Sequence, residues 1–105
     1  MPLIIKNETL EQVKQSKKPV VIDVHAPWCG PCQQMAPLFE ELEKELGDTY
    51  LFASLNVEDA REVAISYGVS SIPTFLFIKD GQLKGKVTGY MSKEDLKEQI
   101  ISHLG

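Results

Sequence analysis

A run of β-branched residues near the start of the chain limits the folds that it can adopt. Residues 20–25 are Val-Val-Ile-Asp-Val-His, a nearly continuous apolar run rather than the alternation of a strand with one face in water. Such runs are typical of a central strand that is covered on both faces. The sequence therefore favours a sheet with helices packed on each side of it.

The single acid in this run, Asp23, is the first candidate for a functional residue. Side chains alternate along a strand, so Asp23 should point to the same face as Val21 and His25. A carboxylate there would be desolvated, and we expect its pKa to be raised. The alternative is an acid at a frayed or solvated end of the strand.

The remaining elements follow the order βαβαβα and then ββα. We expect strands at 3–5, 20–25, 50–57, 75–78 and 83–88, with helices opening near Asn7, at the cysteine pair, after Asp59 and after Ser92. Alternation of strands and helices predicts a parallel core, and a hairpin through Asp80-Gly81 adds antiparallel strands at one side. The predicted architecture is three-layer α/β/α, with a central mixed five-stranded sheet and four helices.

Three finer expectations can be compared with the structure. Asp59 is expected to cap the third helix. The last helix is expected to direct Ile101 inward together with Leu96, Ile100 and Leu104. His103, near the end of the chain, is expected to be solvated.

Composition and charge limit the partners of the chain. It has 105 residues, 43% hydrophobic and 25% charged, which suits one compact domain over residues 1–105. A net charge of −4 argues against a nucleic acid or an anionic membrane as the partner. The first apolar run is too short for a signal peptide and no later run reaches the length of a membrane span, so we expect a cytoplasmic location.

Both cysteines lie in one stretch, Pro27-Trp28-Cys29-Gly30-Pro31-Cys32, and three kinds of site are possible. A structural disulfide over so short a loop would stabilise the fold by only about 2 kcal/mol. A zinc site would need clustered ligand pairs, whereas His25 and His103 are single and far apart, so we expect no metal. The third possibility is a dithiol that cycles to a disulfide.

The position of the pair supplies the chemistry for such a cycle. Attack on a disulfide requires a thiolate, and an ordinary cysteine is mostly protonated at neutral pH. The predicted helix begins at the pair, and the unpaired N–H groups of a helix N-terminus stabilise an anion. Pro31 suits the first turn because its missing N–H would have had no partner there.

With these motifs in hand, the chain resembles the thioredoxin family over essentially its full length. The resemblance is carried by four motifs in the expected order: Val20-Val21-Ile22-Asp23, Trp28-Cys29-Gly30-Pro31-Cys32, Ile72-Pro73-Thr74, and Lys79-Asp80-Gly81 with Gly89 downstream. It implies the thioredoxin fold. It also implies a thiol–disulfide oxidoreductase that reduces protein disulfides and is itself reduced again by thioredoxin reductase. Such a protein would act as a monomer and would bind no cofactor beyond its own disulfide.

The resemblance also implies a role for each site residue. Cys29 would be the exposed attacking thiolate, Cys32 would resolve the mixed disulfide, and Asp23 would exchange a proton with Cys32. Pro73 would be cis, and the Ile72 backbone would pair with an extended substrate strand. The substrate-facing surface would consist of Trp28, Gly30, Pro31, Ile72, Pro73 and Gly89, although Trp28 could simply pack against the helix.

Five positions depart from the common family pattern: His25, Gln33, Ser54, Ser71 and Tyr90. Because many bacterial members carry a lysine where this chain has Ser54, we expect Asp23 to be harder to ionise here. A partly protonated His25 could stabilise the Cys29 thiolate and make the disulfide more oxidising. A neutral, packed histidine is the alternative.

Two other functions compete with the reductase. A disulfide oxidase or isomerase would need an oxidising potential, which the His25 substitution keeps possible. An interaction module would use the surface around Trp28 to hold a partner without redox turnover. Gly30-Pro31 between the cysteines favours the reductase within the family.

Overall fold

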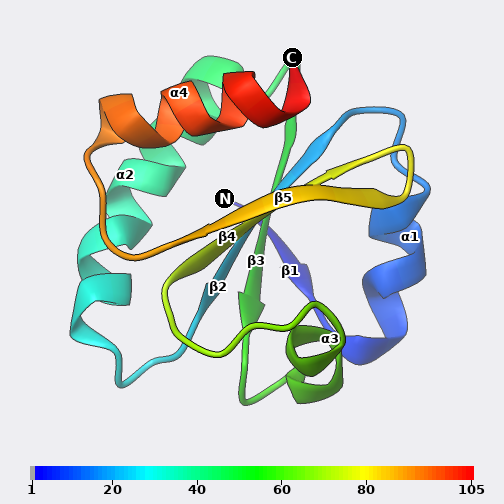
Figure 1. Cartoon of the computed structure of the whole chain (residues 1–105), viewed down its shortest axis with the longest axis vertical. Helices are drawn as coiled ribbons and strands as arrows, with labels where there is room; N and C mark the ends of the chain where they lie inside the picture. The colour runs from blue at the N-terminus through cyan, green and yellow to red at the C-terminus, as the bar shows by residue number, and fades with distance from the viewer. Residues whose placement is uncertain (1) are drawn as a thin grey trace.

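The computed structural model describes residues 2–105, which form a five-stranded sheet with helices on both faces (Figure 1). The strands are β1 (Leu3–Ile5), β2 (Val20–His25), β3 (Leu51–Asn56), β4 (Thr74–Lys79) and β5 (Gln82–Thr88). The helices are α1 (Leu10–Lys14), which follows a short 3-10 turn at Asn7–Thr9, α2 (Gly30–Leu46), α3 (Arg61–Ser66) and α4 (Lys93–Leu104). The predicted element order is confirmed.

Strand β2 occupies the centre of the sheet, as its continuous apolar sequence predicts. The strand order is β1-β3-β2-β4-β5. β2 runs parallel to β3 and antiparallel to β4, so the sheet is mixed. Asp23 lies opposite Ser54 on one side and Phe75 on the other. The five strands and four helices in the described part of the chain make the thioredoxin-type arrangement expected from the sequence.

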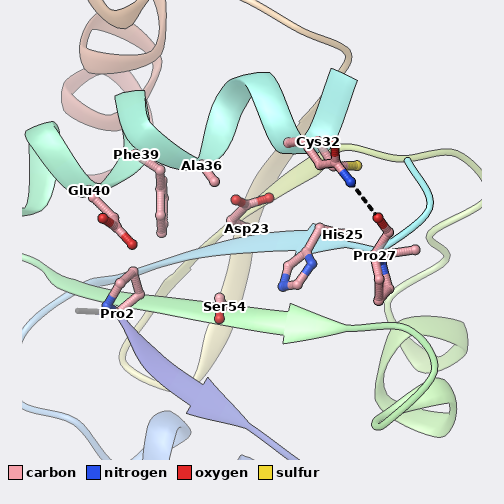
Figure 2. Close-up of a pocket in the computed structure, with 11 residues that line it drawn as sticks. Pro2, Asp23, His25, Pro27, Cys32, Ala36, Phe39, Glu40 and Ser54 are labelled. Carbon is pink, nitrogen blue, oxygen red and sulfur yellow. Dashed lines mark hydrogen bonds between the residues drawn. The ribbon is translucent and has the colours of Figure 1, made fainter. Parts of the chain in front are cut away.

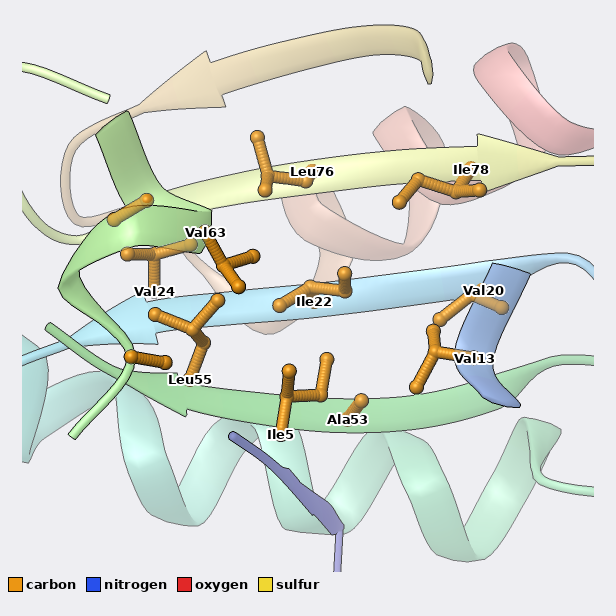
Figure 3. Close-up of a cluster of buried hydrophobic side chains, with 12 residues drawn as sticks. Ile5, Val13, Val20, Ile22, Val24, Ala53, Leu55, Val63, Leu76 and Ile78 are labelled. Carbon is orange, nitrogen blue, oxygen red and sulfur yellow. The ribbon is translucent and has the colours of Figure 1, made fainter. Parts of the chain in front are cut away.

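One face of the sheet is covered by α1 and α3. Val20, Ile22 and Val24 point to this face and pack with Val13 of α1 and Val63 of α3 (Figure 3). Leu55 of β3 and Leu76 of β4 are fully buried in the same cluster. The even-numbered apolar residues of β2 thus build this half of the core, in keeping with the two-residue period of a strand.

The opposite face is covered by α2 and α4, which lie together on one side of the sheet in Figure 1. Its core is rich in aromatic side chains. The Phe39 ring of α2 meets the Phe52 ring of β3 edge to face, with their centroids 5.1 Å apart. Leu96 and Ile100 of α4 are fully buried against the same cluster. Helix α2 is therefore fixed along its length, and with it the position of its first turn.

The turn between β4 and β5 has the backbone that the sequence predicts. Asp80 and Gly81 both have positive φ angles, 55° and 78°. Two consecutive residues of this kind form the tight turn that matches the twist of a hairpin, and Asp-Gly is a favoured pair for it. The hairpin prediction is confirmed.

Three local expectations are wrong. The residue that precedes α3 is Ala60, and no side chain caps the helix, because Asp59 lies one position too early. Ile101 is 46% exposed, whereas Leu96, Ile100 and Leu104 are buried. His103 is half-buried and stacks on Phe77 with 4.6 Å between the ring centroids, so it is packed rather than solvated.

No helix between residues 2 and 105 is both long and apolar enough to cross a membrane.

Candidate active site

The two cysteines open helix α2. Cys29 is the N-cap residue, with extended backbone angles, and Pro31 lies in the first turn. The Sγ of Cys29 accepts a hydrogen bond from the backbone N–H of Cys32 at 3.2 Å. The two residues form a disulfide with their Cα atoms 5.2 Å apart. When the disulfide opens, the same N–H and the helix dipole are in place to stabilise a thiolate on Cys29.

The cysteine pair is more enclosed than we expected. Cys29 is 6% exposed and Cys32 is 4% exposed, and both pack with Ala26, Val57 and Ile72. The expectation of an exposed Cys29 is therefore wrong for the disulfide form. The reason is the loop before β4, which places the carbonyl oxygen of Ile72 4.0 Å from the Cys29 sulfur.

Three segments that are distant in the sequence meet at the pair. The Ile72-Pro73 peptide bond is cis, as the resemblance to the thioredoxin family implied. The N–H of Gly89, at the end of β5, donates to the Pro73 carbonyl at 2.8 Å. Gly89 has a φ of 108° and open space where a side chain would start. Gly89 is thus linked to the Ile72-Pro73 segment, and Ile72 lies beside Cys29.

Trp28 forms the most exposed apolar part of this region. Its side chain is 70% exposed, so it is not simply packed against the helix. The indole Nε1 donates to the carboxylate of Glu58 at 3.3 Å, and the backbone N–H of Glu58 donates in turn to the Asn56 side chain at 2.9 Å. The ring is therefore held by the loop that follows β3 while much of its surface stays open to a partner.

Asp23 lies behind the disulfide in an apolar setting. Its residue is 4% exposed, and its Oδ1 atom has no hydrogen-bond partner among the described residues. Burial raises the pKa of Asp23 from 3.8 to about 7. The predicted burial and the predicted direction of the shift are confirmed. A group with a pKa of about 7 can both take and give a proton near neutral pH.

Asp23 and Cys32 line a common cavity of about 440 Å3 between β2, β3 and α2 (Figure 2). Three of the five unusual positions line it as well: His25, Gln33 and Ser54. The Gln33 amide donates to the Pro27 carbonyl at 2.7 Å. Ser71 and Tyr90 are exposed and do not contribute to this cavity.

His25 is half-buried, and burial lowers its pKa, while the nearby Asp59 carboxylate acts in the opposite direction. The neutral ring is thus favoured. The cavity that His25 lines includes Cys32 but not Cys29. These two findings support the alternative of a neutral, packed histidine over a charged one that acts on Cys29.

Sequence reasoning missed three residues of the site: Ala26, Val57 and Glu58. Ala26 and Val57 pack on the cysteines, and Glu58 holds Trp28. Val57 and Glu58 are about thirty residues from the pair, and only the parallel pairing of β2 with β3 brings them there. Among residues 2–105, no cluster of three or more His, Cys, Asp or Glu side chains could hold a metal ion.

Comparison with known proteins agrees with this geometry. The model of the family described as Thioredoxin matches residues 3–102. The chain belongs to the thioredoxin family. It is 38% identical over 104 residues to a thioredoxin of Bacillus subtilis, covering 99% of this chain and 100% of the relative. It is 41% identical to thioredoxin H4 of Arabidopsis thaliana, covering 91% of this chain and 80% of the relative.

The fold of a solved thioredoxin is similar throughout. A thioredoxin mutant from Halobacterium salinarum matches with a TM-score of 0.89 and 31% identity, covering 99% of this chain and 91% of that one. As a thioredoxin with a Cys29–Cys32 disulfide, the chain is a thiol–disulfide oxidoreductase of the protein-disulfide reductase type. Its redox group is this disulfide, as in other thioredoxins, rather than a bound cofactor.

Proposed function

We propose that Cys29, Cys32 and Asp23 divide the reduction of a protein disulfide among them. The Cys29 thiolate attacks one sulfur of the target, a Cys29–target disulfide forms, and the other target sulfur leaves as a thiolate. The observation that carries this assignment is the N-cap position of Cys29, where the Cys32 N–H points at its sulfur.

The second step uses Cys32 and Asp23. The Asp23 carboxylate takes the proton of the Cys32 thiol, and the Cys32 thiolate attacks the Sγ of Cys29. The Cys29–Cys32 disulfide forms, and the target leaves as its second thiolate, which is protonated from solvent. Two electrons pass from the dithiol to the target. The raised pKa of Asp23 suits this role because the carboxyl can change its protonation state near pH 7.

The target is proposed to bind on the apolar surface around the disulfide. This surface consists of Trp28, Gly30, Pro31, Ile72, Pro73 and Gly89. The exposed face of Trp28 offers an aromatic contact. Gly89 leaves open space beside Pro73, so an extended segment of the target can approach the backbone of Ile72 and pair with it.

The proposed partners are disulfide-containing proteins as targets and thioredoxin reductase as the electron donor. We further propose that residues 1–105 act as one domain, as a monomer, and in the cytoplasm. Support comes from family membership, from the single sheet and from the negative net charge, which disfavours nucleic acids and anionic membranes. Among relatives, location varies: a 40% identical thioredoxin of Pisum sativum is described as M-type and chloroplastic.

Trapping of the intermediate tests the division of roles. In Cys32→Ser the first attack can occur but the second cannot, so a stable Cys29–target disulfide should accumulate with an oxidised protein such as insulin. Cys29→Ser should form no such adduct at a comparable rate. Mass spectrometry of the trapped species identifies the linked cysteine. If the adduct formed mainly through Cys32, the assignment would be wrong.

A further inference from the structure

The cavity behind the disulfide connects a buried acid with a titratable side chain that the mechanism has not used. Asp23 and His25 lie two residues apart on β2, so their side chains project from the same face of the sheet. Both line the cavity drawn in Figure 2. Cys32 lines this cavity from α2 and Ser54 from β3. Thus the resolving cysteine, its proton acceptor and an imidazole share one space.

We propose that this cavity is the route by which Asp23 exchanges its proton with solvent, and that His25 relays the proton along it. The proposal rests on the proposed role of Asp23 in the second step. It makes His25 a positioning and proton-relay residue for Asp23 and Cys32 rather than a partner of the Cys29 thiolate.

Asp23 needs such a route because its own surroundings offer none. The residue is almost fully buried, and its Oδ1 atom has no partner among residues 2–105. With a pKa of about 7 the Asp23 carboxyl is protonated in a large share of the molecules near neutral pH, and it must lose that proton before it can take the one from Cys32. This cavity adjoins both groups, and its volume of about 440 Å3 is enough for several water molecules.

His25 is the best placed of the groups that face this space. The other titratable groups around the ring are Asp23 on the same strand, Cys32 and Glu40 on α2, and Asp59 after β3. Glu40 is exposed and follows Cys32 by about two helical turns. Ser54 and Gln33 do not titrate near neutral pH. His25 is half-buried, so its ring reaches the cavity wall without being sealed from water.

The acid–base properties of the two groups are compatible with a relay. Burial brings the pKa of Asp23 up to about 7, and it brings the pKa of His25 below 6.5. A neutral imidazole can therefore accept the Asp23 proton for a short time and release it to water. Before the second step, the relay moves one proton from a protonated Asp23 to the ring and from the ring to solvent, and it transfers no electrons.

Removal of the imidazole should slow the second step and spare the first. General acid–base groups typically contribute about 10²- to 10⁴-fold, but water in the cavity can carry part of the proton flow, so we expect about a tenfold loss near pH 7. The rates are measured with pre-reduced protein and insulin in single turnovers. Cys32→Ser isolates the first step, and we expect the rate of that step to change less than about twofold in the His25→Ala background.

Imidazole in solution supplies a readout that a purely structural role would not move. Adding imidazole to His25→Ala should restore most of the lost rate, because the truncated side chain leaves room in the cavity. His25→Gln keeps a polar side chain but cannot carry a proton near neutral pH, and it should be about as slow as His25→Ala. The matched control is His103→Ala, whose rates should be unchanged with or without imidazole.

Two results would overturn the relay. One is a His25→Gln variant with the rates and pH profile of the original protein. The other is an equal response to imidazole in His25→Ala and His103→Ala. If Asp23→Asn slows the second step while His25→Gln does not, only the relay is wrong. If Asp23→Asn also leaves the second step unchanged, the proposed role of Asp23 fails with it.

Discussion

At the scale of single residues, the buried Asp23 carboxyl lowers the stability of the fold when it is ionised, and it also provides an acid–base group for the site. Its carboxyl lies in the core face of β2 and lacks a full set of hydrogen-bond partners among the described residues. The ionised carboxylate is unfavourable there because it has lost its contact with water, and this raises the pKa of Asp23 to about 7. The same shift gives the site an acid–base group that responds near neutral pH.

Replacing Asp23 by Asn should therefore stabilise the protein at alkaline pH. Between pH 3.8 and about pH 7 the folded protein holds a proton on Asp23 that the unfolded chain has lost. Stability of the original protein falls as pH rises through this window, and the full difference corresponds to about 4 kcal/mol as an upper estimate. Urea unfolding of the oxidised forms at several pH values measures it.

The control for this prediction is the same unfolding measurement at acidic pH. Below about pH 3.8 the side chain at position 23 is neutral in both proteins, folded and unfolded, so their free energies of unfolding should approach each other. A constant difference between Asp23→Asn and the original protein at all pH values would show that the carboxyl does not titrate in the expected window.

Ser54 offers a second test because it lies directly opposite Asp23 in the parallel pair. Ser54→Lys would place an ammonium group at the same cavity, and an opposite charge favours the ionised carboxylate. We expect the pKa of Asp23 to fall and the pH profile of disulfide reduction to move to lower pH. An unmoved profile would contradict the idea that the missing cation makes Asp23 hard to ionise.

These residues also show what a sequence can and cannot predict. The burial of Asp23 follows from its place inside an apolar strand, which is local information. The cover over Cys29 does not, because it comes from Ile72, which lies 43 residues away. The packing of His103 could not be predicted for a similar reason: His103 is on α4, and Phe77, on which it stacks, is on β4 and distant in the sequence.

At the scale of elements, carbonyl groups at the C-terminal ends of three helices accept hydrogen bonds from lysines elsewhere in the chain. Lys18 donates to the Gly47 carbonyl after α2 at 2.9 Å. Lys86 donates to the Tyr67 and Gly68 carbonyls after α3 at 3.2 and 3.0 Å. Lys79 donates to the Leu104 carbonyl of α4 at 3.4 Å. A cation at this end of a helix interacts favourably with its dipole.

Helix α4 provides a prediction with an internal control. Ile100 is fully buried against the α2 face of the sheet, whereas its neighbour Ile101 is 46% exposed. Ile100→Ala should lower the free energy of unfolding by about 2–5 kcal/mol, as is typical of a buried Ile. Ile101→Ala should change it by less than about 0.5 kcal/mol.

Chemical denaturation of both variants compares the two positions directly. Equal losses would contradict the orientation of α4 in the structure. The spacing already distinguishes them: Leu96, Ile100 and Leu104 repeat every four residues, and a position one further along lies about 100° round the helix. The prediction that Ile101 points inward relied on residue type and neglected this angle.

Most elements were predictable because their signals are local. The apolar run of β2, the Asp80-Gly81 turn and the Ser92 cap each act within a few residues, and the Ser92 hydroxyl does accept from the Asp95 N–H at 3.1 Å. The start of α3 could not be predicted in this way, because the tight turn after β3 places Ala60 rather than Asp59 at the N-cap.

At the scale of the whole molecule, the sheet acts as a frame that brings three distant segments together. The N-terminus of α2, the Ile72-Pro73 loop and the end of β5 meet because β2 lies next to β4, and β4 lies next to β5. The contact between Gly89 and Pro73 depends on this order. The chemistry of the cysteine pair is thus a property of the fold as well as of the motif.

The oxidised protein should be more stable than the reduced one. A disulfide between Cys29 and Cys32 closes a very short loop, and its effect on the unfolded chain is worth about 2 kcal/mol. Thermal or urea unfolding with and without dithiothreitol measures the difference. The Cys29→Ser, Cys32→Ser double variant should show no effect of the reductant, and a reduced form as stable as the oxidised one would contradict this expectation.

The redox equilibrium of the Cys29–Cys32 pair tests the central claim of a protein-disulfide reductase most directly. The oxidised and reduced forms are equilibrated against a reference dithiol, and the fraction of each is measured after acid quenching. A reductase should have a potential at or below that of the cytosolic glutathione pool, about −240 mV. A value near −120 mV, which is typical of a strong disulfide oxidant, would contradict the claim.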